Sequence, residues 1–116
     1  MRPPVQKTKK AERDKAYMGR VAQLPCCICE AFGMAQTSPT QVHHCIHGRY
    51  STSRASDHMT IPLCEGHHQG LRDTSKLAIH QGKETWQNAF GPDYEWAERV
   101  RKRIGRTFFD NATDLH

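Results

Sequence analysis

The chain has 116 residues, of which 36% are hydrophobic, and a mean hydropathy of −0.80. This length favours one domain, and the low hydropathy implies a thin core that a bound metal would help to stabilise. Five cysteines, an odd number, and the lack of a secretory signal pattern argue against a secreted disulfide scaffold. No apolar run is long enough to cross a membrane, so we expect a soluble, cytoplasmic protein with no membrane partner.

The excess of positive charge lies near the N-terminus. The formal net charge is +5, and residues 1–20 hold seven basic side chains against two acidic ones, whereas the rest of the chain holds ten of each. Residues 1–10 contain adjacent prolines and no apolar period, which predicts a disordered basic arm. Such an arm is typical of a sequence-independent contact for nucleic acid, and equally of a solvated tail.

The rest of the chain divides into short elements. In chain order, the pattern predicts a helix over 10–24, a loop over 30–40, strands over 41–46 and 59–63 with a polar loop between them, a short helix over 64–71, and helices over 83–90 and 93–105. The last two helices carry most of the large apolar side chains, among them Trp86, Phe90 and Trp96, which we assign to the core. A strand, a loop, a second strand and a short helix around a metal constitute a ββα arrangement.

Two short motifs predict a metal cage. Cys26-x-x-Cys29 and Cys64-x-x-His67 each present two ligands with a two-residue gap. Three thiolates and one imidazole suit a tetrahedral, closed Zn²⁺ site. A closed cage is structural, so it predicts a zinc-stabilised fold and no activity by itself. Such a zinc adds roughly 10 kcal/mol or more of apparent folding free energy at neutral pH.

Further histidines have no place in that cage. His43 and His44 are adjacent, so on a strand their side chains point to opposite faces, and one can bind a metal while the other acts as a base. His68 and His80 complete a ligand set that leaves coordination positions open for water or phosphate. A base near a metal is typical of a phosphodiesterase. The alternatives are a structural role for the doublet and a surface position for His80.

Together these motifs resemble the HNH (ββα-metal) endonuclease superfamily, and most closely its phage-associated branch of recombination-enhancing, RecA-dependent nucleases, the Ref-like family. The similarity covers roughly residues 10–105. The matching stretches are L-P-C-C-I-C at 24–29, V-H-H-C-I-H-G-R-Y at 42–50, R-A-S-D at 54–57 and I-P-L-C-E-G-H-H-Q-G at 61–70, extended by A-E-R-D-K-A-Y at 11–17, A-I-H at 78–80 and W-Q-N-A-F-G at 86–91.

The resemblance implies a small α+β single domain with a ββα-metal motif and flanking helices. It makes His44 the general base, and it makes His43, His68 and His80 the ligands of a catalytic Mg²⁺, Mn²⁺ or Zn²⁺. The middle Asn of the HNH pattern is absent, and Asp57 or His58 lies nearest its place. The structural-zinc ligands it implies are Cys26, Cys29, Cys64 and His67.

The expected activity is hydrolysis of DNA phosphodiester bonds in recombination, together with a RecA-like filament, in the host cytoplasm if a phage encodes the chain. The expected organisation is a basic arm over 1–10, a nuclease domain over 11–110 and a tail over 111–116. The expected DNA contacts are Arg2, Lys7, Lys9, Lys10, Arg49 and Arg54. Two other functions stay open: a non-catalytic zinc-stabilised DNA-binding or adaptor module, and a nuclease for RNA, because nothing in the sequence reads a 2′-hydroxyl.

Overall fold

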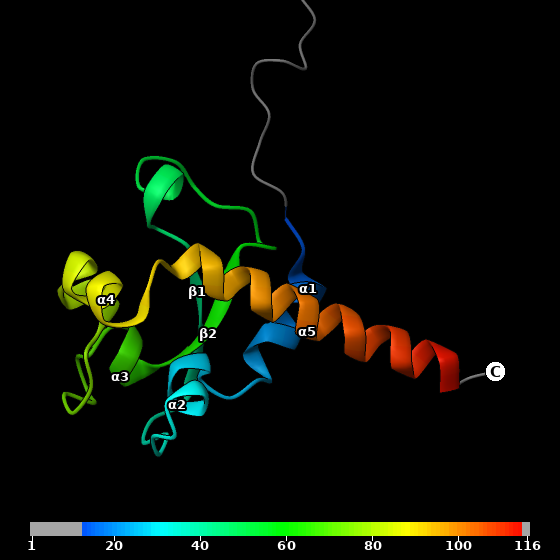
Figure 1. The fold of residues 1–116 in the computed structure, drawn as a ribbon, viewed down its shortest axis with the longest axis horizontal. Helices are drawn as coiled ribbons and strands as arrows, with labels where there is room; N and C mark the ends of the chain where they lie inside the picture. The colour runs from blue at the N-terminus through cyan, green and yellow to red at the C-terminus, as the bar shows by residue number, and fades with distance from the viewer. Residues whose placement is uncertain (1–12, 115–116) are drawn as a thin grey trace, which may run out of the picture.

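A two-stranded antiparallel sheet lies at the centre of the computed structural model, which describes the backbone of residues 13–114 and the side chains of residues 13–105 (Figure 1). Strand β1 (Thr40–His44) pairs with β2 (Thr60–Cys64), and Val42 lies opposite Pro62. The helices are α1 (Lys15–Ala22), α2 (Cys27–Ala31), α3 (Glu65–His68), α4 (Lys83–Phe90) and α5 (Asp93–Asp114), with 3-10 turns at Gly48–Tyr50 and Ile79–Gln81. The domain is therefore of the α+β class.

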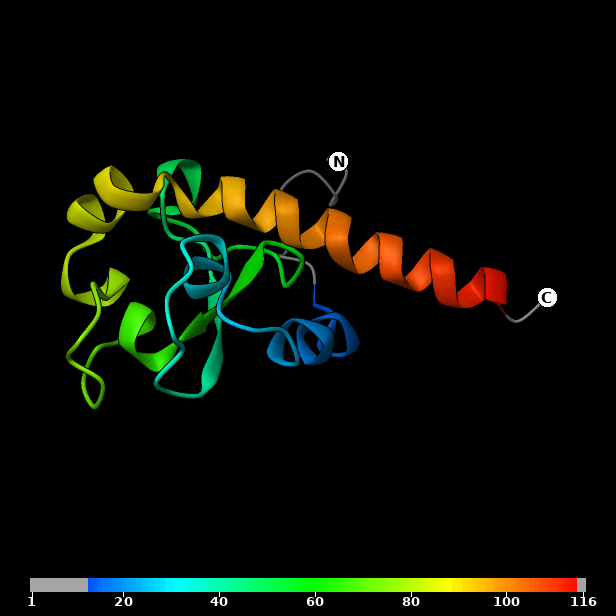
Figure 2. The same cartoon turned by 60° about the horizontal axis from the view of Figure 1, so that its bottom comes forward.

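The element limits follow local sequence signals. Helix α1 begins later than predicted, at Lys15, because the Asp14 carboxylate caps it by accepting the Tyr17 N–H at 3.0 Å. Helix α4 has the predicted limits, and Gly91 ends it in a positive-φ conformation. Helix α5 runs past the predicted end at residue 105 to Asp114. Figure 2 shows its C-terminal half projecting beyond the sheet.

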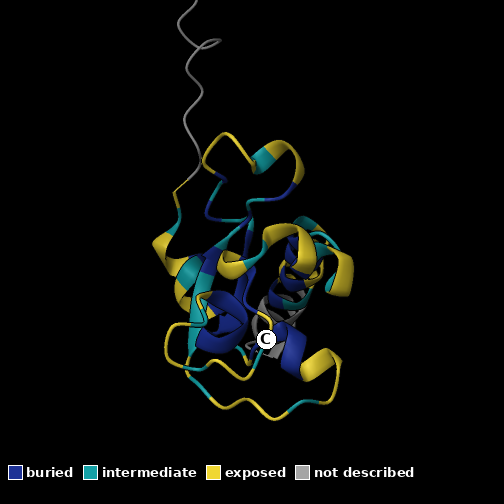
Figure 3. Ribbon diagram, turned by 90° about the vertical axis from the view of Figure 1, so that its left-hand side faces the viewer, coloured by how far each residue is buried: buried dark blue, intermediate teal, exposed yellow. Residues whose placement is uncertain are grey.

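The core surrounds the sheet and the inner faces of the helices, where Figure 3 shows the buried segments in dark blue. Fully buried Ile61 and Leu63 come from β2, Ile28 from α2 and Trp86 from α4. Trp86 and Trp96 are buried as predicted, and Phe90 packs against them half-buried. Among the described residues, no helix is both long and apolar enough to cross a membrane.

Candidate metal centres and catalytic base

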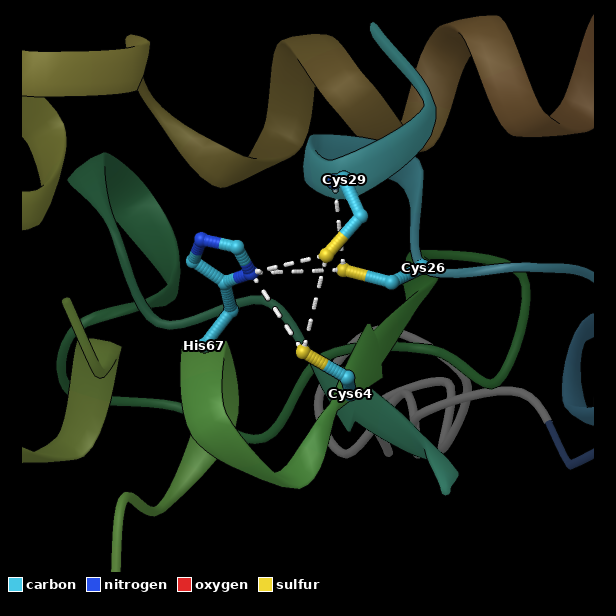
Figure 4. Close-up of side chains that lie close together, drawn as sticks. All are labelled: Cys26, Cys29, Cys64 and His67. Carbon is cyan, nitrogen blue, oxygen red and sulfur yellow. Dashed lines mark hydrogen bonds between the residues drawn. The ribbon is translucent and has the colours of Figure 1, made fainter. Parts of the chain in front are cut away.

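Four donor atoms, from α2 and the residue that caps its start, from the end of β2 and from α3, converge beside the sheet (Figure 4). Nδ1 of His67 lies 3.5 Å from Cys26 Sγ and 3.6 Å from Cys29 Sγ. The same nitrogen lies 3.4 Å from Cys64 Sγ, and the sulfurs of Cys29 and Cys64 are 3.9 Å apart. All four residues are buried. The two motifs recognised in the sequence therefore form one cluster.

These separations match tetrahedral zinc coordination. Zn–S bonds of about 2.3 Å and Zn–N bonds of about 2.0 Å at tetrahedral angles place two sulfurs about 3.8 Å apart, and a sulfur and a nitrogen about 3.5 Å apart. Burial raises the pKa of the Cys29 thiol to about 12, with the nearby Cys26 sulfur as a further cause. Three thiolates held this closely in the interior repel one another, so a bound cation is needed to keep them ionised. The donor set thus fits one Zn²⁺.

A second cluster contains only imidazoles. His43 of β1, His68 of α3 and His80 of the Ile79–Gln81 turn each bring a ring nitrogen within 4.8 Å of the others. His43 and His68 are buried, whereas His80 is exposed, so one side of the cluster faces solvent. Burial lowers the pKa of His68 to about 3, with repulsion from His43 and His80 adding to it, and burial likewise lowers the pKa of His80. Neutral imidazole is the form that binds a metal, so the cluster fits a divalent ion with an open side.

Two polar side chains orient these rings. The Asp93 carboxylate at the start of α5 accepts the Nε2–H of His43 at 2.9 Å, which leaves Nδ1 for a metal. The Gln41 amide oxygen lies 2.7 Å from Nδ1 of His68, which leaves Nε2 for a metal. Asp93 also accepts the backbone N–H groups of Ile46 at 2.7 Å and His47 at 3.2 Å. Such outer partners fix the tautomer and the orientation of ligating histidines.

Asp93 is itself fully buried and ionised. Burial raises the pKa of its carboxyl, but the hydrogen bonds from His43 and Ile46 outweigh burial, so the net pKa is lowered. His47 closes the same network, because its Nδ1 accepts the Asp93 N–H at 2.9 Å and its Nε2 donates to the Lys83 carbonyl at 2.9 Å. Both ring nitrogens of His47 are therefore engaged inside the fold, and this residue is structural.

His44, the last residue of β1, has a carboxylate partner of its own. Its Nε2 lies 2.8 Å from Oδ1 of Asp57, in the loop between the strands. The His44 side chain is 28% exposed, whereas that of Asp57 is 2% exposed. The hydrogen bond from His44, followed by one from the Asp14 N–H, lowers the pKa of Asp57. Because an ionised Asp57 accepts the Nε2–H, Nδ1 of His44 carries the lone pair and has the tautomer that a general base requires.

Asp57 rather than His58 is the residue that contacts His44. His58 instead lies with Nε2 2.8 Å from Oδ2 of Asp14, and its ring meets the Tyr17 ring edge-on at 4.9 Å. Since Asp14 caps α1 and also donates its N–H to Asp57 at 2.7 Å, the start of α1 is tied to the loop that holds the His44 ring.

A family model described as "Recombination enhancement, RecA-dependent nuclease" matches residues 9–100, a stretch that includes both clusters and His44. The chain belongs to this family of RecA-dependent nucleases. No curated protein and no solved structure gave a match. The family name bears out the nuclease and recombination part of the resemblance seen in the sequence.

Two of the predicted DNA contacts lie among the residues that the structure describes. Arg49 and Arg54 are both exposed on the segment between the strands. The other four predicted contacts, Arg2, Lys7, Lys9 and Lys10, belong to the arm over 1–10, which lies outside the described residues.

The two residues that orient the rings, Gln41 and Asp93, carry little local sequence signal. Gln41 shares a strand face with His43 through the two-residue period of β1, which is a weak signal. Asp93 is fifty residues from His43, and its only local signal is an acidic residue in the first turn of a helix.

Proposed function

We propose that the protein is a metal-dependent endonuclease of the HNH (ββα-metal) type, which hydrolyses phosphodiester bonds in DNA during recombination with a RecA-like filament. The order β1, β2, α3 supports this type, because His44 ends the first strand and His68 lies in the following helix. The observation that carries the proposal is the pairing of an imidazole cluster open on one side with an adjacent histidine, His44, whose Nε2 lies 2.8 Å from the buried Asp57 carboxylate.

The two clusters have different roles in this proposal. Cys26, Cys29, Cys64 and His67 hold a structural Zn²⁺, and His43, His68 and His80 hold the catalytic ion, with Mg²⁺, Mn²⁺ or Zn²⁺ as candidates. When bound, that ion supplies a Lewis acid that stabilises charge on the phosphate and on the leaving oxygen.

The side chains perform the proton chemistry. Nδ1 of His44 removes a proton from the attacking water, while Asp57 keeps the ring in place and stabilises the imidazolium that forms. Asp93 prevents rotation of the His43 ring, and Gln41 does the same for His68.

Substitution of three histidines tests these roles. His44→Ala should lower RecA-stimulated DNA cleavage by roughly 10² to 10⁴-fold and leave two metals per chain, because a base is lost and no ligand is. His43→Ala should abolish cleavage and leave one metal per chain. His58→Ala is the matched control, since its side chain is 29% exposed against 28% for His44. The control should keep both its metals and most of its activity.

Metal content and cleavage together separate the alternatives. If His44→Ala loses the second metal and His43→Ala keeps it, the roles of the two residues are reversed. If both variants cleave like the wild type, the protein is a zinc-stabilised DNA-binding or adaptor module and the catalytic proposal is wrong. An RNA strand of the same sequence, cleaved as fast as DNA, would contradict the assignment of DNA as the substrate.

A further inference from the structure

A cavity of about 820 Å³ lies between α5 and the segment that follows β1, and its lining includes neither metal cluster nor His44. We call it the α5 cavity. This volume is typical of a ligand site. Its charged lining residues are four cations against two carboxylates, namely Arg49, Arg99, Arg101 and Lys102 against Glu95 and Glu98. The surplus of positive charge favours an anionic ligand.

The α5 cavity also has aromatic lining. The rings of Tyr50 and Tyr94 have centroids 6.4 Å apart and are inclined at 53°, so they do not stack on each other. Gly48 permits the Tyr94 ring to lie against the Gly48–Tyr50 turn, because Gly48 has a φ of +61° and a Cβ there would lie 2.9 Å from Cε2 of Tyr94. The Arg49 guanidinium lies 5.0 Å from the centre of the Tyr50 ring. Cations interleaved with aromatic rings are the usual means of binding single-stranded nucleic acid.

The α5 cavity is connected to the proposed catalytic site through two elements. Helix α5 begins at Asp93, the partner of His43, and continues directly into the cavity lining at Tyr94. Met59, also in the lining, accepts the N–H of Cys45, the residue after His44, at 3.0 Å. From Asp93 to Lys102 the helix extends about 14 Å.

Building on the nuclease function proposed above, we propose that the α5 cavity binds single-stranded DNA next to the site of cleavage. Arg101 and Lys102, both exposed, contact the phosphates. Tyr50 and Tyr94 stack against unpaired bases, which a duplex does not offer. Arg99 is held over the Trp96 ring at 4.4 Å and presents a fixed cation to the strand.

Binding measured without cleavage tests the α5 cavity. The full-length, zinc-loaded chain carrying His44→Ala is titrated into a fluorescein-labelled oligothymidylate of about 16 nucleotides and into a duplex of equal length, with fluorescence anisotropy as the signal. Adding Tyr50→Leu should weaken single-strand binding about 5- to 150-fold and leave both the salt dependence and duplex binding unchanged. Adding Arg101→Ala and Lys102→Ala should make the slope of log K against log salt shallower by about 1.4.

A charge-matched control removes two exposed lysines outside the cavity, Lys15 and Lys83, and should leave the slope unchanged. The proposal is wrong if Tyr50→Leu binds the oligothymidylate like its parent, or if it weakens single strand and duplex equally. It is also wrong if the variant with Arg101→Ala and Lys102→Ala has the same slope of log K against log salt as the lysine control. If the cavity variants bind DNA normally and, in chains with His44 intact, lose only RecA-stimulated cleavage, the DNA-binding proposal is wrong and the cavity is a protein-docking site. Because His44→Ala is the common background, a failure of the cleavage proposal does not affect these results.

Discussion

Asp93→Asn is expected to weaken both the fold and the imidazole cluster, although it changes one atom. The Asp93 side chain is fully buried, and its two oxygens accept from His43, Ile46 and His47. An amide accepts through only one of its two end atoms, so its NH₂ group must face at least one buried N–H. Each buried donor left without an acceptor costs about 1–3 kcal/mol, and the loss is larger where the lost acceptor was charged. We therefore expect the free energy of unfolding to fall by about 2–4 kcal/mol.

The same substitution should lower metal affinity. A His43 ring without its carboxylate partner is free to rotate, and loss of such a partner typically reduces metal affinity or activity 10- to 100-fold. Urea unfolding of the zinc-loaded protein measures stability, and calorimetric titration with Mn²⁺, which thiolates bind weakly, measures the imidazole cluster. Glu95→Gln is the matched control, because Glu95 is exposed two residues further along α5 and should change stability by less than about 0.5 kcal/mol.

Two results would refute the reasoning for Asp93. If Asp93→Asn has the same free energy of unfolding and the same Mn²⁺ affinity as the Glu95→Gln control, the hydrogen bonds of Asp93 contribute nothing measurable. If stability falls and Mn²⁺ affinity does not, Asp93 anchors the start of α5 without orienting His43.

Three further predictions concern the cage, the arm and the response to acid. Cys64→Ala should lower zinc content and melting temperature together, and a variant that keeps its circular dichroism and melting temperature after chelation would show that the cage assignment is wrong. Deletion of residues 1–10 removes four cations, so duplex binding should weaken and its salt slope should become shallower by up to about 3.6, whereas an unchanged slope would make the arm a solubility tail. Backbone N–H groups of residues 71–73, that of Asp73 first, lower the pKa of Glu65 below its ordinary 4.5. The unfolded chain therefore binds more protons in this range, and the stabilisation by Glu65 is present above about pH 4.5 and lost as the pH falls through the lowered pKa. Glu65→Gln should flatten this acid limb in urea unfolding at pH 3–6, and an unchanged limb would contradict the assignment.

The features that depend on short stretches of chain could be predicted without a structure. A two-residue gap places two ligands on one turn, so Cys26 with Cys29, and Cys64 with His67, could be recognised as pairs without a structure. The local sequence pattern gave the limits of α4, and the alternation of strand side chains separated the directions of His43 and His44.

Contacts between side chains that are distant in the sequence became known only from the fold. The sequence offered His80 both as a ligand and as a surface residue, and the structure places its turn beside α3, with a ring nitrogen close to those of His43 and His68. Asp57 and His58 were equivalent in the sequence, and the loop conformation turned Asp57 to His44 and His58 to Asp14. The pairing of Asp93 with His43 and the α5 cavity both depend on how α5 packs against the sheet. No local pattern encodes that packing, because it results from the burial of apolar residues spread along the whole chain.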